Sequence, residues 1–200
     1  LCGDDLLRPD HLALMTAAAG AHPDISLVTS RRLMIDAGGQ VLRDMTPLSF
    51  EAQTSVLDGM AVGESVLTSG VNWIGEPTTV MFRADRLPVE DLYALGTRNP
   101  ARNLDVVWWL KIMAGARVAF VNEPLSMFRT HGGQQSQQPE LQLDLVLAWY
   151  DIIAGARDLG YLAQPAAEGQ ALAWLVELIN TRVESFGPAA WPRVSAVLAQ

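Results

Sequence analysis

The hydrophobic and polar positions follow two different patterns along the chain, and the first pattern gives way to the second near Pro139. Before that point, short apolar runs alternate with glycine, proline and polar turns, as in the strands and short helices of an α/β domain. After it, long runs are apolar over much of the helical circumference, which indicates helices that each pack on more than one neighbour. The pattern predicts three such helices, over residues 140–159, 166–186 and 189–199.

The first part of the chain predicts alternating helices and strands. A helix is expected from Pro9 to Gly20, because proline is favoured at the first helical position and glycine ends helices. Its predicted apolar face consists of Leu12, Met15 and Ala19. The other predicted elements are a strand over 25–30, a hairpin of residues 33–35 and 41–42 turning at Gly38 and Gly39, a helix from Ser49 to about Met60, a helical turn over 64–68, a strand over 78–82 and a helical turn within 89–95.

The stretch from residue 103 to 136 combines such elements with side chains that can carry chemistry. Asp105 opens an apolar helical run that contains Trp108 and Trp109, of which at least one should lie in the core. The run is followed by two predicted strands, residues 117–121 and 125–129, with Glu123 and Pro124 between them. A carboxylate therefore begins the helix, and Arg129 and His131 stand at the end of the strand that follows.

Composition narrows the classes of function. Two hundred residues with 50% hydrophobic and 18% charged side chains suit one domain, or one domain with a helical appendage. The net charge of −8 argues against a nucleic-acid partner. A single cysteine, Cys2, excludes a disulfide framework and suits a reducing compartment, and no apolar run reaches membrane-spanning length. We therefore expect a cytoplasmic protein, with peripheral association at the inner face of a membrane left open.

Four motifs, taken in order, resemble the catalytic domain of family 2 glycosyltransferases, which have the GT-A fold. The motifs are Gly3-Asp4-Asp5-Leu6-Leu7-Arg8-Pro9, Ile74-Gly75-Glu76-Pro77-Thr78 with Met81-Phe82-Arg83, Asp105 at a helix start, and Pro124-Leu125 to Arg129-Thr130-His131. They cover roughly the first two-thirds of the chain. The resemblance implies an α/β three-layer sandwich with a mostly parallel sheet, formed by residues 1–138, and a helical extension over residues 139–200. It also implies that the first strands of the family, which bind the nucleobase, precede Leu1, so that this chain alone should bind nucleotide sugars poorly.

The resemblance assigns roles to two acids. Asp4 takes the position of a ligand to a divalent metal, Mg²⁺ or Mn²⁺, which would neutralise the diphosphate of a nucleotide-sugar donor. Asp105 takes the position of the catalytic base, which would deprotonate an acceptor hydroxyl in an inverting transfer. Cys2 replaces the first aspartate of the family's metal motif, and Leu104 stands where most members carry a further acid. Each acid could instead cap a helix, as aspartate often does.

The remaining candidate residues surround the same predicted site. His131 could be a further metal ligand, and Arg129 could pair with a phosphate, although both could equally be solvated. Asp5 lies beside the metal position, and Glu76 could accept hydrogen bonds from sugar hydroxyls or simply belong to a turn. Because Trp73 lies near Glu76 in the sequence, it is the preferred residue for stacking on a sugar. The histidines His11 and His22 are interpreted as ordinary surface residues.

Two other functions remain open. The chain could be a catalytically inactive GT-A-like interaction module that docks on a partner, or on a second copy of itself, through its apolar C-terminal helices. A nucleotidyltransferase is a third reading, which would release pyrophosphate. Bacterial proteins that resemble this chain often build surface polysaccharide, but fold-level likeness fixes neither the donor sugar nor the acceptor.

Overall fold

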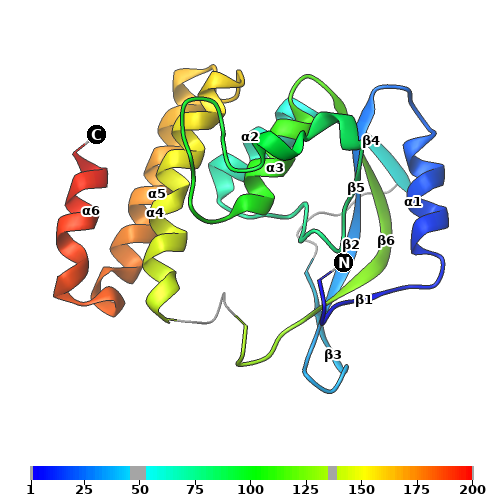
Figure 1. Ribbon diagram of the computed structural model, residues 1–200, viewed down its shortest axis with the longest axis horizontal. Helices are drawn as coiled ribbons and strands as arrows, with labels where there is room; N and C mark the ends of the chain where they lie inside the picture. The colour runs from blue at the N-terminus through cyan, green and yellow to red at the C-terminus, as the bar shows by residue number, and fades with distance from the viewer. Residues whose placement is uncertain (1, 46–52, 135–138, 200) are drawn as a thin grey trace.

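The computed structural model describes residues 2–45, 53–134 and 139–199, which form a mixed sheet with helices on both faces (Figure 1). Helix α1 (His11–Ala19) covers one face, and helices α2 (Gly59–Ser69) and α3 (Leu104–Met113) cover the other. Beyond these lie α4 (Pro139–Asp158) and α5 (Pro165–Phe186), with α6 (Trp191–Leu198) outermost at the left of Figure 1. The α/β class and the three predicted C-terminal helices are confirmed.

Two long strands, β2 (Ile25–Ile35) and β6 (Arg117–Arg129), run parallel through the centre of the sheet. The short strands β1 (Leu6–Leu7) and β4 (Thr54–Asp58) both pair with β6, while β3 (Val41–Asp44) and β5 (Met81–Phe82) both pair with β2. All four of these pairings are antiparallel. Each long strand therefore has two short strands along its outer side.

The expectation of a mostly parallel sheet is wrong for the described residues. A parallel pair needs a long crossover between its strands, whereas a tight turn can only join antiparallel neighbours. Strand β3 follows β2 through such a turn, where Gly39 has a φ of 88° that glycine adopts without steric cost. The sequence correctly predicted this hairpin.

Strand β6 is continuous, although Pro124 was expected to divide it. The register between β2 and β6 shifts on both sides of the pair Arg31 and Pro124, which accommodates the proline. On the other side of β6, pairing with β4 stops at Val121 and pairing with β1 starts at Ser126. Pro124 therefore lies in a gap between two neighbouring strands, where its missing N–H costs no ladder hydrogen bond.

Two further predicted elements need correction. The helix expected from Ser49 to Met60 is wrong over residues 54–58, since β4 occupies Thr54–Asp58, and residues 46–52 lie outside the described residues. Helix α2 begins only at Gly59, after Asp58, whose side chain accepts a hydrogen bond from the Ala61 N–H. The strand expected over 78–82 is reduced to Met81–Phe82, because residues 77–79 form a turn.

The face of α1 was also predicted only in part. Met15 and Ala18 are buried against the sheet, whereas Leu12 is 67% exposed. His11, expected at the surface, is buried, and its Nδ1 lies 3.2 Å from the Leu125 carbonyl oxygen. The helix begins at His11 rather than Pro9, so the residue that starts it faces β6.

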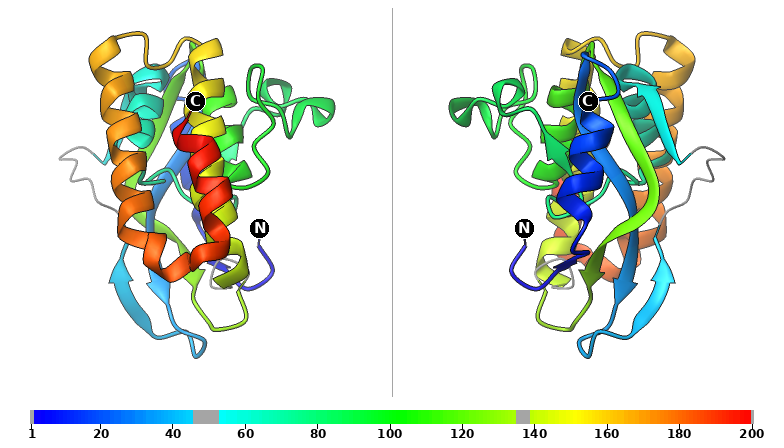
Figure 2. Two further views of the ribbon diagram at one scale, coloured as in Figure 1. Left: turned by 90° about the vertical axis from the view of Figure 1, so that its left-hand side faces the viewer. Right: turned by 90° about the vertical axis from the view of Figure 1, so that its right-hand side faces the viewer.

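One large hydrophobic cluster joins the helices on the α2 side of the sheet to the C-terminal helices. It includes Leu67 of α2, Trp109 of α3, Ile152 of α4 and Leu175 of α5. A smaller cluster, around Met15, fills the space between α1 and the opposite face. The segment between β5 and α3, drawn in green, projects to one side and contains the short helices η1 (Ala84–Arg86) and η2 (Val89–Asp91) (Figure 2). No helix in the described ranges is long and apolar enough to cross a bilayer.

Candidate functional site

Asp4 and His131, the two predicted metal ligands, are in contact. Asp4 Oδ2 lies 3.0 Å from His131 Nε2. Strand β1 pairs antiparallel with the end of β6, in the register Leu6 to Met127, which brings the turn before β1 beside the turn after β6. The hydrogen bond from His131 holds the pKa of the Asp4 carboxyl below its usual value.

Arg129 and Asp5 fix this corner of the molecule. Arg129 donates from Nε to the Asp4 carbonyl at 2.8 Å, and from Nη1 to the carbonyls of Asp36 and Ala37 at 3.0 Å each. The buried Asp5 accepts the backbone N–H of Arg129 at 3.0 Å. In this structure, Nε and Nη1 of Arg129 thus tie the Asp4 turn to the β2–β3 hairpin, which is a structural role in addition to the phosphate contact expected for this residue.

The loop over residues 72–76 presents Glu76, and its backbone is held by side chains from β2 and α3. Arg32 donates to the carbonyls of Asn72 and Trp73 at 2.9 Å each, and its Nε lies 3.0 Å from Glu76 Oε2. Thr29 donates to the Ile74 carbonyl. The indole of Trp109 donates to the carbonyl of the next residue, Gly75, at 2.8 Å. Consecutive carbonyls of this loop therefore have side-chain donors, which fixes the position of Glu76.

Asp105 lies in the first turn of α3 and contacts the same loop. Its Oδ2 accepts a hydrogen bond of 2.8 Å from Asn72 Nδ2. Burial raises the pKa of the Asp105 carboxyl, while the backbone N–H of Val106, the Asn72 amide and the charge of Arg32 oppose that shift. A partly buried carboxylate with a raised pKa is suited to accept a proton near neutral pH.

The two halves of the site are linked through Glu76. Burial raises the pKa of Glu76, the charge of Arg32 lowers it, and the charges of Asp105 and Asp5 raise it further. The loop that carries Glu76 is also the loop that contacts Asp105, through Asn72. Two contacts hold the same segments together: the Cys2 N–H donates to Thr78 Oγ1 at 2.8 Å, and the hydroxyls of Thr79 and Ser126 lie 2.8 Å apart. Asp4 and His131 thus form one pair, and Asp105 and Glu76 form a second group reached through Asp5.

Arg32 and Asn72 were not singled out from the sequence. The only signal for Arg32 is its place between the predicted strands 25–30 and 33–35, which the structure joins into one strand, β2, where Arg32 is 4% exposed. A buried arginine requires an anionic or carbonyl partner, so its position in β2 could have directed attention to the 72–76 loop.

The expectation that Trp73 stacks on a sugar is wrong. Its ring is buried in the large hydrophobic cluster, and its Nε1 donates to Ser65 Oγ of α2 at 2.9 Å. Trp109 is fully buried as well, as expected for at least one member of the Trp108–Trp109 pair.

The residues present can supply part of a divalent-metal site. No group of three His, Cys, Asp or Glu side chains within residues 2–45, 53–134 and 139–199 is arranged to bind a metal ion. Mg²⁺ and Mn²⁺ at diphosphate sites commonly use one or two protein ligands, with water and phosphate oxygens completing the shell. The contact between a carboxylate oxygen and an imidazole nitrogen fits that pattern, and the nitrogen favours Mn²⁺ over Mg²⁺.

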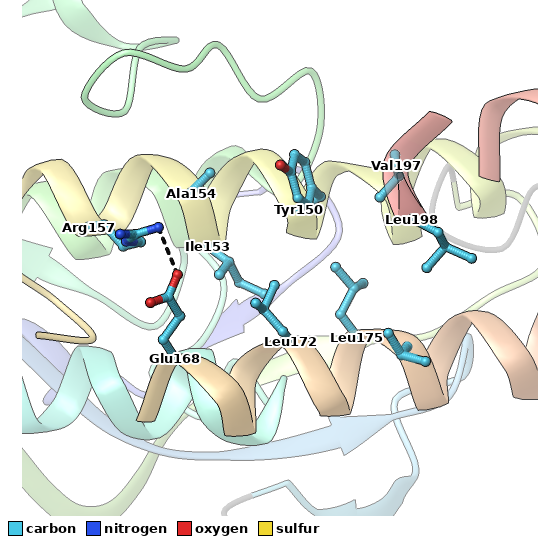
Figure 3. Close-up of a pocket in the computed structure, with 10 residues that line it drawn as sticks. Tyr150, Ile153, Ala154, Arg157, Glu168, Leu172, Leu175, Val197 and Leu198 are labelled. Atoms are coloured by element: carbon cyan, nitrogen blue, oxygen red, sulfur yellow. Dashed lines mark ion pairs between the residues drawn. The ribbon is translucent and has the colours of Figure 1, made fainter. Parts of the chain in front are cut away.

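A separate cavity, lined by none of these residues, lies between the C-terminal helices (Figure 3). It has a volume of about 270 Å³, and apolar side chains from α4, α5 and α6 line most of it. Arg157 and Glu168, which form an ion pair of 2.7 Å, lie at one end. The lining includes Leu172 and Leu198, which are both partly exposed.

Comparison with known proteins adds no assignment. No family model matches the chain, and a search of curated proteins finds no significant match.

Proposed function

We propose that this chain carries the metal, base and acceptor part of a glycosyltransferase that moves a sugar from a nucleotide-diphosphate sugar to an acceptor hydroxyl, with inversion. The observation that supports this proposal best is the contact of Asp4 with His131. The charges of Asp5, the neighbour of Asp4, and of Asp105 both act on Glu76. The residues Asp4, Glu76, Asp105 and His131 come from four separate motifs of the sequence. A nucleotide-sugar transferase of the GT-A kind, as implied by the resemblance, uses these residue types together.

In the proposed reaction, Asp105 accepts the proton of the acceptor hydroxyl as its oxygen attacks the anomeric carbon. The new bond joins that oxygen to the sugar, and the bond from the anomeric carbon to the phosphate oxygen breaks, so that its electron pair leaves with the diphosphate. A divalent cation, when bound, neutralises the charge that develops on the diphosphate. Asp4 and His131 would hold that cation, with Asp5 beside them, and Glu76 would accept hydrogen bonds from sugar hydroxyls.

The charges at the site make donor binding dependent on a cation. Arg32 is paired with Glu76, and Arg129 donates to backbone carbonyls. The carboxylates of Asp4, Asp5 and Asp105 therefore leave the region negative, and a diphosphate would be repelled. We expect UDP- or GDP-sugars to bind the full-length protein with Mn²⁺ and to lose most of that binding when EDTA removes the metal.

The decisive test is Mn²⁺ binding, measured by the electron paramagnetic resonance signal of the free ion. Asp4→Asn and His131→Ala should each weaken Mn²⁺ affinity by at least about tenfold. The exposed pair of Asp24 and His22, at 3.7 Å, offers a matched control, since Asp24→Asn makes the same chemical change at a different turn. Equal Mn²⁺ affinity in Asp4→Asn, Asp24→Asn and the unchanged protein would refute the metal site.

The base is tested separately by turnover. Asp105→Asn keeps the shape of the side chain but cannot accept the proton, so sugar transfer should fall by about 10²- to 10⁴-fold while Mn²⁺ binding is retained. Release of nucleoside diphosphate, rather than pyrophosphate, distinguishes the glycosyltransferase from a nucleotidyltransferase.

An inactive interaction module is the second candidate, and the apolar cavity between α4, α5 and α6 is the observation that favours it. In that case Leu172→Glu, placed in the cavity wall, would abolish self-association or partner binding measured by sedimentation. Asp105→Asn would then leave that association unchanged.

A further inference from the structure

Asn72 is the residue that joins the 72–76 loop to the first turn of α3, where Asp105 lies. Its Oδ1 accepts the backbone N–H of Gly75 at 3.2 Å. Its Nδ2 donates to Asp105 Oδ2 at 2.8 Å and lies 3.3 Å from the Gly75 carbonyl. Because Oδ1 is used by an N–H group, Nδ2 is the atom that must face the carboxylate, and the amide has one satisfactory orientation.

The backbone of Asn72 is fixed as firmly as its side chain. Its carbonyl accepts from Nη2 of the buried Arg32, and the carbonyl of the following residue accepts from Nη1. Gly75, the other partner of the amide, is held through its carbonyl by Trp109 from the interior of α3. Gly75 also has a φ of 113°, and a Cβ there would lie 2.9 Å from Thr79 Cβ, so the turn requires glycine. Asn72 therefore reaches Asp105 from a rigid support.

We propose that Asn72 is a positioning residue for the base: its Nδ2 holds Asp105 Oδ2, so that the carboxylate meets the acceptor hydroxyl in a single orientation. This inference rests on the proposed function, because it takes Asp105 as the base. A base that is held in place before the substrate arrives loses less conformational freedom in the transition state. The first turn of α3 contributes a second donor to Asp105, the Val106 N–H.

The hydrogen bond also has an electrostatic consequence. A donor to a carboxylate favours its ionised form, and in this site the Asn72 amide opposes the effect of burial on the pKa of Asp105. Removing the donor must therefore raise the pKa of Asp105. The acid limb of the pH–rate profile would move to higher pH in the same variant, since the base has to be ionised to act.

The test uses two variants of Asn72 and a matched control. Asn72→Asp keeps the shape of the side chain but replaces the donor by an acceptor, and Asn72→Ala removes both groups. Asn180→Ala makes the second change at an exposed position of α5. The first readout is the pKa of Asp105 in the full-length protein, measured by a pH titration of the ¹³C NMR signal of its carboxyl carbon. The signal that is missing from the spectrum of Asp105→Asn is the one that belongs to Asp105. We expect a higher pKa in both Asn72 variants, and more so in Asn72→Asp, with no change in Asn180→Ala.

The second readout is turnover. In the Asn72 variants kcat should fall by up to about a hundredfold with little change in KM for the donor, because orientation of the base is lost while donor contacts remain. An unchanged Asp105 pKa in both Asn72 variants would overturn the positioning role. A raised pKa in a protein that shows no sugar transfer at all would instead sustain the contact and refute the proposed function.

Discussion

At the scale of single residues, Arg32 has the largest energetic consequence in the site. Its guanidinium is buried in β2 and contacts two loop carbonyls and one carboxylate. Removing one member of a buried ion pair leaves the other uncompensated, which costs far more than losing a surface pair. Arg31, the adjacent residue, faces solvent more and pairs with Asp44 on β3. The two arginines therefore form a natural comparison.

Arg32→Met should lower the free energy of unfolding by about 3 kcal/mol at neutral pH, because Glu76 loses its cationic partner and the carbonyls of Asn72 and Trp73 lose their donor. Arg31→Met, which breaks an exposed pair, should cost less than about 1 kcal/mol. Urea denaturation of both variants measures the difference. Adding Glu76→Gln to Arg32→Met should restore part of the loss, since the uncompensated charge is then absent.

The pH dependence of the same comparison follows from Glu76. Burial raises its folded-state pKa above the unfolded value, so its contribution favours folding at low pH and is lost as pH rises through the folded-state pKa. Arg32 counteracts that rise, and without it the pKa of Glu76 is higher still. The stability difference between Arg32→Met and the unchanged protein should therefore be largest at neutral pH and shrink under mild acid. A constant difference across that range would show that Glu76 is not the partner responsible.

Among single residues, the order and spacing of motifs in the sequence identified Asp4 and His131, but residues that support the site through contacts formed only on folding were missed. Asp4 and His131 were selected from separate motifs, and they are in contact. Arg32 and Asn72 were not, because Arg32 acts on loop carbonyls about forty residues away and Asn72 acts on Asp105, and both partners approach only after folding. Trp73 was misassigned for the converse reason: it is close to Glu76 in the chain, but its side chain turns into the core toward α2.

At the scale of elements, close backbone approaches at glycine determine how helices and loops pack. Gly155 of α4 faces the projecting loop between β5 and α3, and a Cβ there would lie 2.3 Å from the Leu95 carbonyl oxygen. At Gly169, near the start of α5, an added Cβ would have no heavy atom within 4 Å. Gly155 of α4 is therefore in close contact with a neighbouring backbone, whereas Gly169 of α5 faces open space.

Gly155→Ala should destabilise the protein by about 1–3 kcal/mol, because the backbone of the 95–98 turn cannot move aside without strain. Gly169→Ala should stabilise it by about 0.5–1 kcal/mol, since alanine loses less conformational entropy in a helix than glycine does. Thermal unfolding of the two variants checks both signs. Equal destabilisation by both substitutions would contradict the prediction that steric contact determines the effect at Gly155 and helix propensity the effect at Gly169.

The elements themselves were predictable where the local signal agreed with the fold. The long C-terminal helices and the β2–β3 hairpin have strong periodicity or turn residues, and both were predicted correctly. Strand β4 was taken for a helix because its five residues, with exposed and half-buried positions in alternation, have too little apolar content to indicate a strand. Its conformation is set by pairing with β6, a partner more than sixty residues away in the register Val56 to Ala119.

At the scale of the whole molecule, the C-terminal helices and the sheet region share one hydrophobic cluster. Trp174 of α5 packs edge-to-face on Trp149 of α4, with ring centroids 5.1 Å apart. Its ring also fills the space over Gly70 at the end of α2, where a Cβ would lie 1.7 Å from it. Helices before and after Pro139 therefore depend on the same side chains for their burial.

From this shared packing we expect residues on both sides of Pro139 to unfold in one transition. Trp174→Ala should lower the free energy of unfolding by about 3 kcal/mol, and the loss of sheet and of helix should shift together because the cluster spans both. Trp191→Ala, at a tryptophan that is 51% exposed on α6, should have a far smaller effect. Hydrogen exchange resolved by residue measures this directly, by comparing amides of β6 with amides of α5 in each variant. Should the α5 amides open at a much lower free energy than those of β6 in the unchanged protein, the helices would be a separate folding unit, and the shared cluster would not couple them.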